Sequence, residues 1–268
     1  MSALAGIRPI AICGHPRSGT SLLFRIANSH PEIFMTTEFN CFRRLDVPYP
    51  AHARSIRKNW FRRPIIVPRD GSNGRGNARL ASGVFLFRYL TGLLSHSGGP
   101  IDAQAVLETL HRLAPWAKFV GDKKPNYIRR LDTLLRMPGL ACIVIYRDCR
   151  DVASSVLAKI RGAWAGRPIA SRLSSAAQIA DFWIESIETM ERHASQLNII
   201  RYERLVTDPQ SVLMDLGSWL GIDGRGFKYG QINPGSIGNY RRGLTLDELR
   251  DILDIAGPTM RRLGYITD

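Results

Sequence analysis

The stretch from Ile10 to Ser21 constrains the fold of this chain more than any other part of the sequence. It begins with an apolar run that ends at Cys13 and is typical of a buried parallel strand. A loop bounded by Gly14 and Gly19 follows, and a helix is expected from about Ser21. Such a unit binds anions, because the loop N–H groups and the positive end of the helix dipole face the same point. The sequence therefore predicts an α/β fold with a phosphate site after its first strand.

The two glycines have the spacing of a Walker A loop, but the positive charge lies elsewhere. A Walker A loop continues with a lysine that reaches the nucleotide phosphates, whereas Thr20 and Ser21 follow Gly19 here. The cation lies inside the loop instead, at Arg17. This pattern argues against an ordinary ATPase or GTPase. Taken alone, the loop leaves open a turn whose glycines serve only tight packing.

Composition bounds the remaining possibilities. The 268 residues, 44% of them apolar, suffice for one sizeable core, so we predict a single domain over residues 1–268. The net charge of +14 indicates an anionic partner, with solubility as the simpler explanation. The four cysteines form no CxxC pair and no cluster with metal-binding spacing, so we expect reduced thiols, no metal and a cytoplasmic setting. We expect neither a signal peptide nor a transmembrane segment.

Strands and helices alternate along the chain. Further strands are expected at 32–35, 118–120, 140–146 and 197–202, and helices at 84–95, 102–113, 174–194, 209–220 and 246–263. This alternation predicts a mainly parallel central sheet flanked by helices on both faces.

The segment from about 41 to 117 departs from this pattern. Between residues 41 and 83 the periodicity fades, and ten basic residues stand against only Asp46 and Asp70. Residues 68–77 predict a turn-rich loop. We interpret the segment as a basic insertion over the site, a candidate acceptor-binding lid. A solvated basic surface is the alternative.

A second anion site is predicted after the strand at 140–146. Arg147 follows this strand directly, and Ser155 lies in the next helix. A strand–loop–helix corner can turn both toward the crevice where open α/β sheets bind ligands. A guanidinium there gives a bidentate, permanently charged contact to an anion, and a hydroxyl adds a neutral donor. The alternative for Arg147 is a surface ion pair with Asp148 or Asp151.

These motifs resemble those of sulfotransferases that use 3′-phosphoadenosine 5′-phosphosulfate (PAPS). PRSGTS resembles the family's 5′-phosphosulfate loop, and R-x-x-R-D-V-x-x-S resembles its 3′-phosphate site. YERL resembles the YEDL segment, with Arg204 where aspartate is common, and Asn239 to Gly243 resembles the R-K-G signature. The resemblance covers about residues 8–40, 118–160 and 197–245 and implies a P-loop NTPase-like sulfotransferase fold.

The resemblance implies PAPS as the sulfuryl donor, PAP as the product and no required metal. The donor-binding residues that it implies are Arg17, Ser18, Gly19, Thr20, Ser21, Arg147, Ser155, Tyr202, Arg241, Arg242 and Gly243. Tyr202 would lie near the adenine or ribose, and a buried tyrosine with a satisfied hydroxyl is its alternative.

The resemblance also implies catalytic residues, Glu38, Lys123 and Arg17. HPEIFMTTEFN resembles a segment of tyrosylprotein and several carbohydrate sulfotransferases whose glutamate is the base, which corresponds to Glu38. Cytosolic small-molecule sulfotransferases use a histidine in a K-x-H context that we do not find here. Lys123, in GDKKP, would stabilise the departing phosphate. The side chains of Lys123 and Lys124 should diverge, so we expect one of these two lysines to be only solvated. The alternative for Glu38 is an ion pair with a nearby arginine such as Arg43.

Two other functions remain open from the sequence. A P-loop kinase of a small molecule is disfavoured by the missing Walker lysine. A non-enzymatic binder of nucleic acid or anionic lipid is disfavoured because the basic residues lack interleaved aromatics, so we expect no specific nucleic-acid partner. The acceptor is expected to be anionic, given the basic insertion, or sugar-like or phenolic. The aromatic residues that favour a sugar or phenol are Phe39, Phe42, Tyr49, Trp60 and Trp164.

Overall fold

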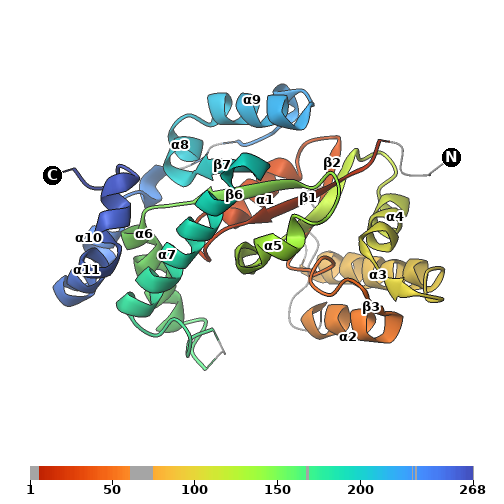
Figure 1. Cartoon of the computed structure of the whole chain (residues 1–268), viewed down its shortest axis with the longest axis horizontal. Coiled ribbons are helices and arrows are strands. Elements are labelled where there is room, and N and C mark those ends of the chain that lie inside the picture. Colours follow the sequence, from red (N-terminus) through yellow and green to blue (C-terminus); the bar gives the residue numbers. More distant parts are fainter. Residues whose placement is uncertain (1–5, 61–74, 167–168, 231, 233, 268) are drawn as a thin grey trace.

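The computed structural model describes residues 6–60, 75–166, 169–230, 232 and 234–267. Its centre is a sheet with the strand order β2-β5-β1-β6-β7, in which every neighbouring pair is parallel (Figure 1). The strands of this sheet are β1 Arg8–Cys13, β2 Ile33–Thr37, β5 Phe119–Lys123, β6 Ala141–Tyr146 and β7 Leu197–Arg201. The predicted fold, a mainly parallel sheet between helices, is confirmed.

Helices cover both faces of the sheet. The longer helices are α1 Thr20–Ala27, α2 Tyr49–Trp60, α3 Arg75–Leu94, α4 Ala103–Leu113, α6 Cys149–Ile160, α7 Ala176–Arg192, α9 Pro209–Leu220 and α11 Leu246–Arg262. Shorter α-helices are α5 Leu131–Leu134, α8 Tyr202–Thr207 and α10 Tyr240–Gly243. The 3₁₀ helices are η1 Pro125–Arg130, η2 Ala194–Gln196, η3 Gly224–Gly226 and η4 Pro234–Ser236.

Alternate residues of β1 belong to two different apolar cores. Ile10 and Ile12 pack with α1, α8 and α9, whereas Ala11 and Cys13 pack in the core that contains α3, α4, α6, α7 and α11. Figure 1 shows α8 and α9 above the sheet and α7 and α11 below it. Both faces of the strand are therefore buried, which explains its uninterrupted apolar sequence.

Strand β5 is longer than predicted. The sequence indicated a strand only at 118–120, but pairing with β1 continues as far as Lys123, which lies opposite Ile12. Glycine, aspartate and lysine are depleted in strands, and here the ladder on both sides of β5 overrides that preference. Because side chains alternate along a strand, Asp122 and Lys123 point to opposite faces at its carboxyl end.

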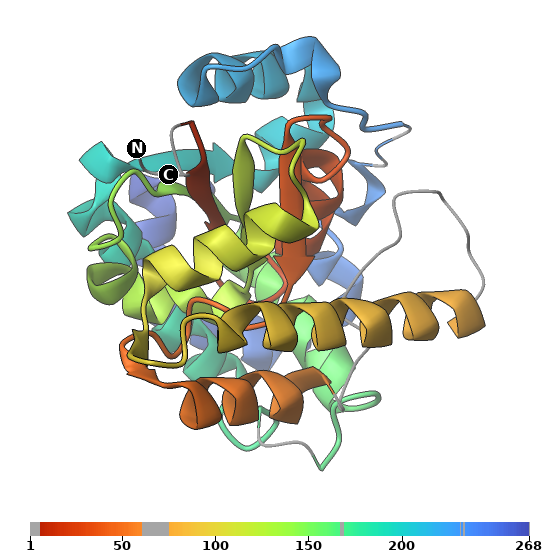
Figure 2. The same ribbon diagram turned by 90° about the vertical axis from the view of Figure 1, so that its right-hand side faces the viewer.

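The segment 41–117 is more regular than predicted. The fading periodicity hides α2, and Arg75 already starts α3, so the predicted loop is wrong at residues 75–77. The rest of that predicted loop, residues 68–74, falls outside the described residues. The short antiparallel strands β3 Val47–Pro48 and β4 Pro100–Ile101 pair beside these helices. Figure 2 shows α3 (gold) between α2 (orange) and α4 (yellow).

The four cysteines are buried and carry free thiols. None of the helices in the described part of the chain has the length and apolar character of a membrane span.

Gly121→Ala is expected to destabilise the sheet. A Cβ atom at Gly121 would lie 1.7 Å from the carbonyl oxygen of Ile10 on the neighbouring strand. Overpacking against backbone cannot be relieved by a side-chain rotation, so we expect a loss of about 3 kcal/mol or more in unfolding free energy. Urea denaturation measures this loss. Gly98→Ala, where nothing lies within 4 Å of the added atom, is the control, and equal stability of the two variants would contradict the close approach.

Candidate active site

A cavity of about 750 Å³ opens at the carboxyl edge of the sheet. The predicted site residues that line it are Arg17, Gly19, Thr20, Ser21, Glu38, Arg147, Ser155 and Tyr202. They come from the segments that follow β1, β2, β6 and β7. The parallel edge thus gathers most of the predicted residues around one cavity.

The cavity also contains residues that the sequence analysis missed. Arg25 on α1 and Lys159 on α6 line it, each four residues after Ser21 or Ser155. Residues four apart share a face of a helix, so this spacing could have identified both cations. Asn239 also lines the cavity, and it was named only as part of the weak C-terminal motif.

The loop after β1 presents N–H groups to the cavity. Gly19 is the N-cap of α1, with a φ of 100° and no side-chain cap hydrogen bond. Among the described residues, the N–H groups of Gly19, Thr20 and Ser21 donate to no protein acceptor. A Cβ atom on Gly19 would lie 2.4 Å from the ring of Tyr202, so the loop needs glycine here. The free N–H groups and the helix dipole make this point favourable for an anion.

Ser18 and His15 face away from this cavity. The Ser18 N–H donates to the carbonyl oxygen of His15 at 3.1 Å, and its buried hydroxyl lines a small cavity behind the loop. The Nδ1 atom of His15 lies 2.7 Å from the carbonyl oxygen of Pro16. Burial lowers the pKa of His15 to about 4, so the ring is neutral near pH 7. Both side chains therefore shape the loop from behind.

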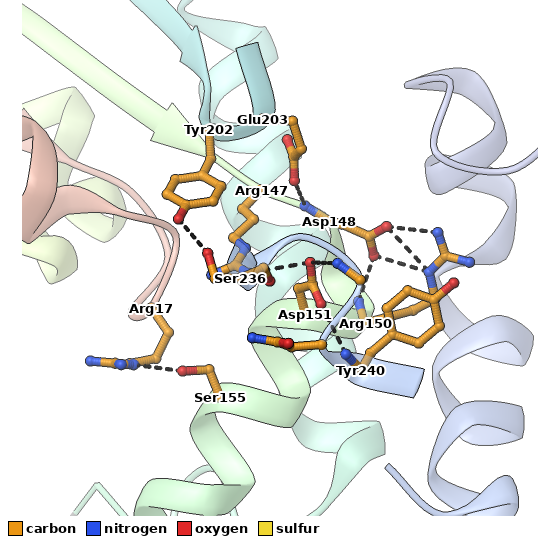
Figure 3. A network of polar contacts seen from close by, with 12 residues as sticks. Arg17, Arg147, Asp148, Arg150, Asp151, Ser155, Tyr202, Glu203, Ser236 and Tyr240 are labelled. Carbon is orange, nitrogen blue, oxygen red and sulfur yellow. Dashed lines mark hydrogen bonds and ion pairs between the residues drawn. The ribbon is translucent and has the colours of Figure 1, made fainter. Parts of the chain in front are cut away.

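Arg147 lies at the end of β6 in a buried network (Figure 3). Its Nη2 atom is 3.2 Å from Asp151 Oδ2, with the two side chains only 8% and 1% exposed. The guanidinium stands 4.4 Å from the centre of the Tyr202 ring and also donates to the carbonyl oxygen of Ser236. The ion pair considered for Arg147 thus exists with Asp151, but it is buried, and Asp148 pairs with Arg150 instead.

Asp151 also fastens the C-terminal segment to α6. Its two carboxylate oxygens accept the N–H groups of Gly238 at 2.9 Å and Tyr240 at 3.0 Å. A Cβ atom on Gly243 would lie 2.1 Å from Ser154 Oγ, so α10 and α6 are in close contact. One buried carboxylate therefore joins the end of β6, α6 and the segment that borders the cavity.

The cations of the predicted C-terminal motif lie outside the cavity wall. Arg241 is exposed and stacks on the ring of Tyr240, with 5.0 Å to its centre. Arg242 is exposed and donates to Asn239 Oδ1 at 3.2 Å. Neither these arginines nor Gly243 line the cavity, although Asn239 of the same segment does.

Arg17 and Ser155 meet across the cavity. Arg17 Nε donates to Ser155 Oγ at 2.9 Å, and Figure 3 shows the two side chains pointing toward each other. Burial, and then the like charge of Arg147, lower the pKa of Arg17. Arg17 pairs with a neutral hydroxyl here, so its positive charge is available to an anion in the cavity.

Glu38 and Lys123 form an ion pair beside the loop. Lys123 Nζ lies 3.2 Å from Glu38 Oε1 and 3.3 Å from Ser21 Oγ. The Lys123 side chain is 2% exposed, whereas that of Glu38 is 36% exposed and lines the cavity. The carboxylate thus reaches the cavity, and the ammonium lies beneath it between Glu38 and the start of α1.

Of the five aromatic residues considered for acceptor binding, Trp164 lines the cavity, whereas Phe39, Phe42, Tyr49 and Trp60 do not. Phe39 and Phe42 are buried in the core, where Phe39 packs against Tyr89 with ring centres 4.8 Å apart, so neither ring is displayed to an acceptor at this cavity. These two rings are buried because they pack in one apolar core with side chains of α2 and α3.

A metal ion has no evident ligand set in the described part of the chain. No group of three or more His, Cys, Asp or Glu residues there is arranged to hold one. Strand β5, the neighbour of the loop strand, ends in Lys123 rather than in a carboxylate of the kind that holds Mg²⁺ in P-loop NTPases. Arg17 and Lys123 both place positive charge near the loop.

The comparison with protein families identifies the chain. The model of the Sulfotransferase family matches residues 9–225. The chain belongs to the sulfotransferase family. The sulfotransferase predicted from the motifs is thereby confirmed at the level of the family. The kinase and the non-enzymatic binder lose their support.

Solved sulfotransferases share the fold. The sulfotransferase domain from the Synechococcus PCC 7002 olefin synthase matches with a TM-score of 0.59 at 19% identity, over 95% of each chain. Sulfotransferase STF9 from Mycobacterium avium matches with a TM-score of 0.52 at 14% identity, over 97% of this chain and 77% of that one. Mouse sulfotransferase SULT7A1, complexed with PAP, matches with a TM-score of 0.52 at 15% identity, over 95% and 85%. No curated protein sequence matches the chain.

Asp151→Asn is expected to destabilise this sulfotransferase. It leaves the buried Arg147 guanidinium without its counter-charge, which costs about 3 kcal/mol of unfolding free energy. Urea denaturation measures the loss. Asp247→Asn removes one partner of the exposed Asp247–Arg250 pair, 3.0 Å apart, and should cost about 0–1 kcal/mol. Similar losses of unfolding free energy in both variants would show that the buried Asp151–Arg147 pair stabilises the protein no more than an exposed ion pair does.

Proposed function

We propose that this sulfotransferase moves a sulfuryl group from PAPS to a hydroxyl or amine of an acceptor, with PAP as the second product. The observation that carries the proposal is a pair of candidate anion sites in one cavity, one made by the free N–H groups at the start of α1 with Arg17 and the other by Arg147 with Ser155. Two separated anion sites suit a donor with a 5′-phosphosulfate and a 3′-phosphate. ATP and ADP lack the second group. The PAP complex of the mouse relative adds support.

In this proposal the donor lies along the carboxyl edge of the sheet. The N–H groups of Gly19, Thr20 and Ser21, with Arg17, hold the 5′-phosphosulfate, and Ser18 keeps the loop in shape. Arg147 and Ser155 hold the 3′-phosphate, for which Ser155 releases its contact with Arg17. The ring of Tyr202, already against the loop and Arg147, borders the adenine or ribose. Arg241, Arg242 and Gly243 of α10 do not line the cavity in this structure, so the proposal has their segment move toward the 3′-phosphate when the donor binds.

The catalytic roles follow from the Glu38–Lys123 pair. Glu38 accepts the proton of the acceptor hydroxyl or amine as its oxygen or nitrogen bonds to sulfur. The bond from sulfur to the 5′-phosphate oxygen breaks, and the electron pair stays on the phosphate of PAP. Lys123, Arg17 and the loop N–H groups stabilise the charge that develops there. These groups cover the phosphate with positive charge, so the proposal requires no metal.

The acceptor side is proposed to lie past Glu38, at the basic segment 41–117. Lys124 Nζ donates to Asn40 Oδ1, two residues after Glu38. Lys124 is half-buried and the Lys123 side chain is 2% exposed, so neither of the two lysines is only solvated, as one of them was predicted to be. Burial, and then the charge of Arg43, lower the pKa of Lys124 to about 8. Arg43 has no hydrogen-bond or ion-pair partner for its guanidinium among the described residues. These cations favour an acceptor with an anionic group, and Trp164 would suit a sugar or phenol ring.

We also propose a cytoplasmic location, which the four free thiols favour.

Calorimetric titration with PAP and with ADP, without added magnesium, tests the donor site. We expect the protein to bind PAP more tightly than ADP, and Arg147→Ala to weaken PAP binding about 10–100-fold, because a hydrogen-bonded charge pair is lost. ADP binding should change little in this variant. Lys118→Ala is the control, because it removes one positive charge just before the amino end of β5, at the edge of the sheet away from the cavity. This variant should keep its affinity for both PAP and ADP.

Equal loss of PAP and ADP binding in Arg147→Ala would mean that Arg147 does not read the 3′-phosphate. Because this variant leaves Asp151 unpaired, Ser155→Ala provides a milder second test, with a several-fold loss for PAP alone. Binding of ATP only, and only with magnesium, would indicate a kinase.

Glu38→Gln is expected to lower turnover by about 10²–10⁴ while leaving PAP affinity unchanged, because the amide cannot take a proton. The measurement is PAP release with an acceptor found by screening sugars, phenols and acidic peptides. Glu32→Gln, at the amino end of β2, is the matched control and should keep full turnover. Normal turnover of Glu38→Gln would exclude Glu38 as the base.

A further inference from the structure

The segment that carries Glu38 has an uncommon backbone conformation. Glu38 and Asn40 have φ angles of 56° and 66°, in the left-handed region that residues with a side chain rarely adopt. Such a conformation is intrinsically unfavourable, and it persists only where surrounding groups hold the backbone. The direction of the Glu38 carboxylate therefore depends on whatever holds residues 38–40.

The carboxylate of Asp122 is the main group that holds this segment. Its Oδ1 accepts the N–H of Phe39 at 3.1 Å, and its Oδ2 accepts the N–H of Asn40 at 2.9 Å. Asp122 has no exposed surface. The hydroxyl groups of Thr36 and Tyr127 each lie 2.8 Å from one of its oxygens. All four of these groups donate to the carboxylate, and two of them come from the residues directly after Glu38.

The charge state of Asp122 matters to this arrangement. Burial raises its pKa, whereas the hydrogen bonds from Thr36, Tyr127, Asn40 and Phe39 act in the opposite direction. Both carboxylate oxygens face a backbone N–H, which is a fixed donor. A proton on either oxygen would oppose one of these donors, so the geometry suits the ionised form.

Lys123 completes the hold on Glu38. The carbonyl oxygen of Lys123 accepts the Glu38 N–H at 2.7 Å, and its ammonium contacts the Glu38 carboxylate at 3.2 Å. The backbone and the side chain of Glu38 are thus both tied to Lys123, and the two residues that follow Glu38 are tied to Asp122. Because β5 pairs directly with β1, this fixes Glu38 relative to the phosphate loop.

We propose that Asp122 is a positioning residue for sulfuryl transfer, acting through the N–H groups of Phe39 and Asn40 to hold Glu38 in the conformation that aims its carboxylate at the acceptor. The inference rests on the proposed role of Glu38 as the base. Asp122 does not line the donor cavity, so its effect is exerted on Glu38 and not on the donor.

Asp122→Asn tests this role, because it changes the hydrogen bonding without changing the volume. The new NH₂ group must face at least one N–H of the segment, donor against donor, so residues 38–40 should relax. Displacement of a catalytic group by about 1 Å can cost about 10²-fold in rate. We therefore expect turnover to fall about 10²-fold while the affinity for PAP stays unchanged by calorimetry.

Tyr127→Phe is the matched control. It removes one hydrogen bond to the same buried carboxylate, from η1, but leaves both N–H contacts to the Glu38 segment in place. A purely structural role of Asp122 predicts that this variant and Asp122→Asn lose stability and turnover in parallel. The positioning role predicts reduced stability in both, with turnover close to the original only in Tyr127→Phe.

A double-mutant cycle with Glu38→Gln tests the path of the effect. If Asp122 acts through Glu38, Asp122→Asn should cause no further loss of turnover once the carboxylate is gone. Multiplied losses in the double variant, or a parallel fall in PAP affinity, would overturn the proposal. The failure of each proposal can be told apart. Normal turnover of Glu38→Gln would reject Glu38 as the base. Reduced turnover of Glu38→Gln together with normal turnover of Asp122→Asn would reject only the positioning role of Asp122.

Discussion

The site of this sulfotransferase depends on one constraint, the ending of five parallel strands along a single edge. The strand that carries the phosphate loop, β1, lies in the middle, with β5 on one side and β6 on the other. The segments that follow β2, β5, β6 and β7 therefore lie around the loop, although they are distant from it in the sequence. Glu38 and Arg147 are far apart in the chain, yet they line one cavity for this reason. A slip in the pairing of β5 would turn Lys123 away from the loop, since side chains alternate along a strand.

Electrostatics then determines what the cavity can hold. Buried cations are tolerated where a carboxylate stands beside them, as Asp151 does for Arg147 and Glu38 does for Lys123. Arg17 has only a hydroxyl, and the N–H groups at the start of α1 have no protein acceptor in the described part of the chain. The folded protein thus retains positive potential at the loop, where the 5′-phosphosulfate is proposed to bind. Arg147 and Ser155 line the same cavity, so an anion with two charged ends can contact both places.

The sequence was sufficient to predict the features that directly follow the end of a strand. Once the strands were recognised and assumed to be parallel, we could place the loop with Arg17, the corner with Arg147 and Ser155, and Glu38 at the same edge of the sheet. The pairing of Glu38 with Lys123 was not predicted, because the last residues of β5 have poor strand propensity and only the ladders on both sides make them a strand. Asp122 was missed for the same reason. The burial of Phe39 could not be foreseen either, since it depends on α2 and α3 covering a segment whose periodicity is weak.

The most direct test of the account is a crystal structure of the protein with bound PAP. The account predicts a 5′-phosphate that accepts the N–H groups of Gly19, Thr20 and Ser21, and a 3′-phosphate in contact with Arg147 and Ser155. The hydrogen bond between Arg17 and Ser155 should then be open, with both side chains turned to phosphate oxygens. A bisphosphate bound outside this cavity, or a 3′-phosphate in solvent beside an unchanged Arg147–Asp151 pair, would contradict the central claim that these two sites together recognise the donor.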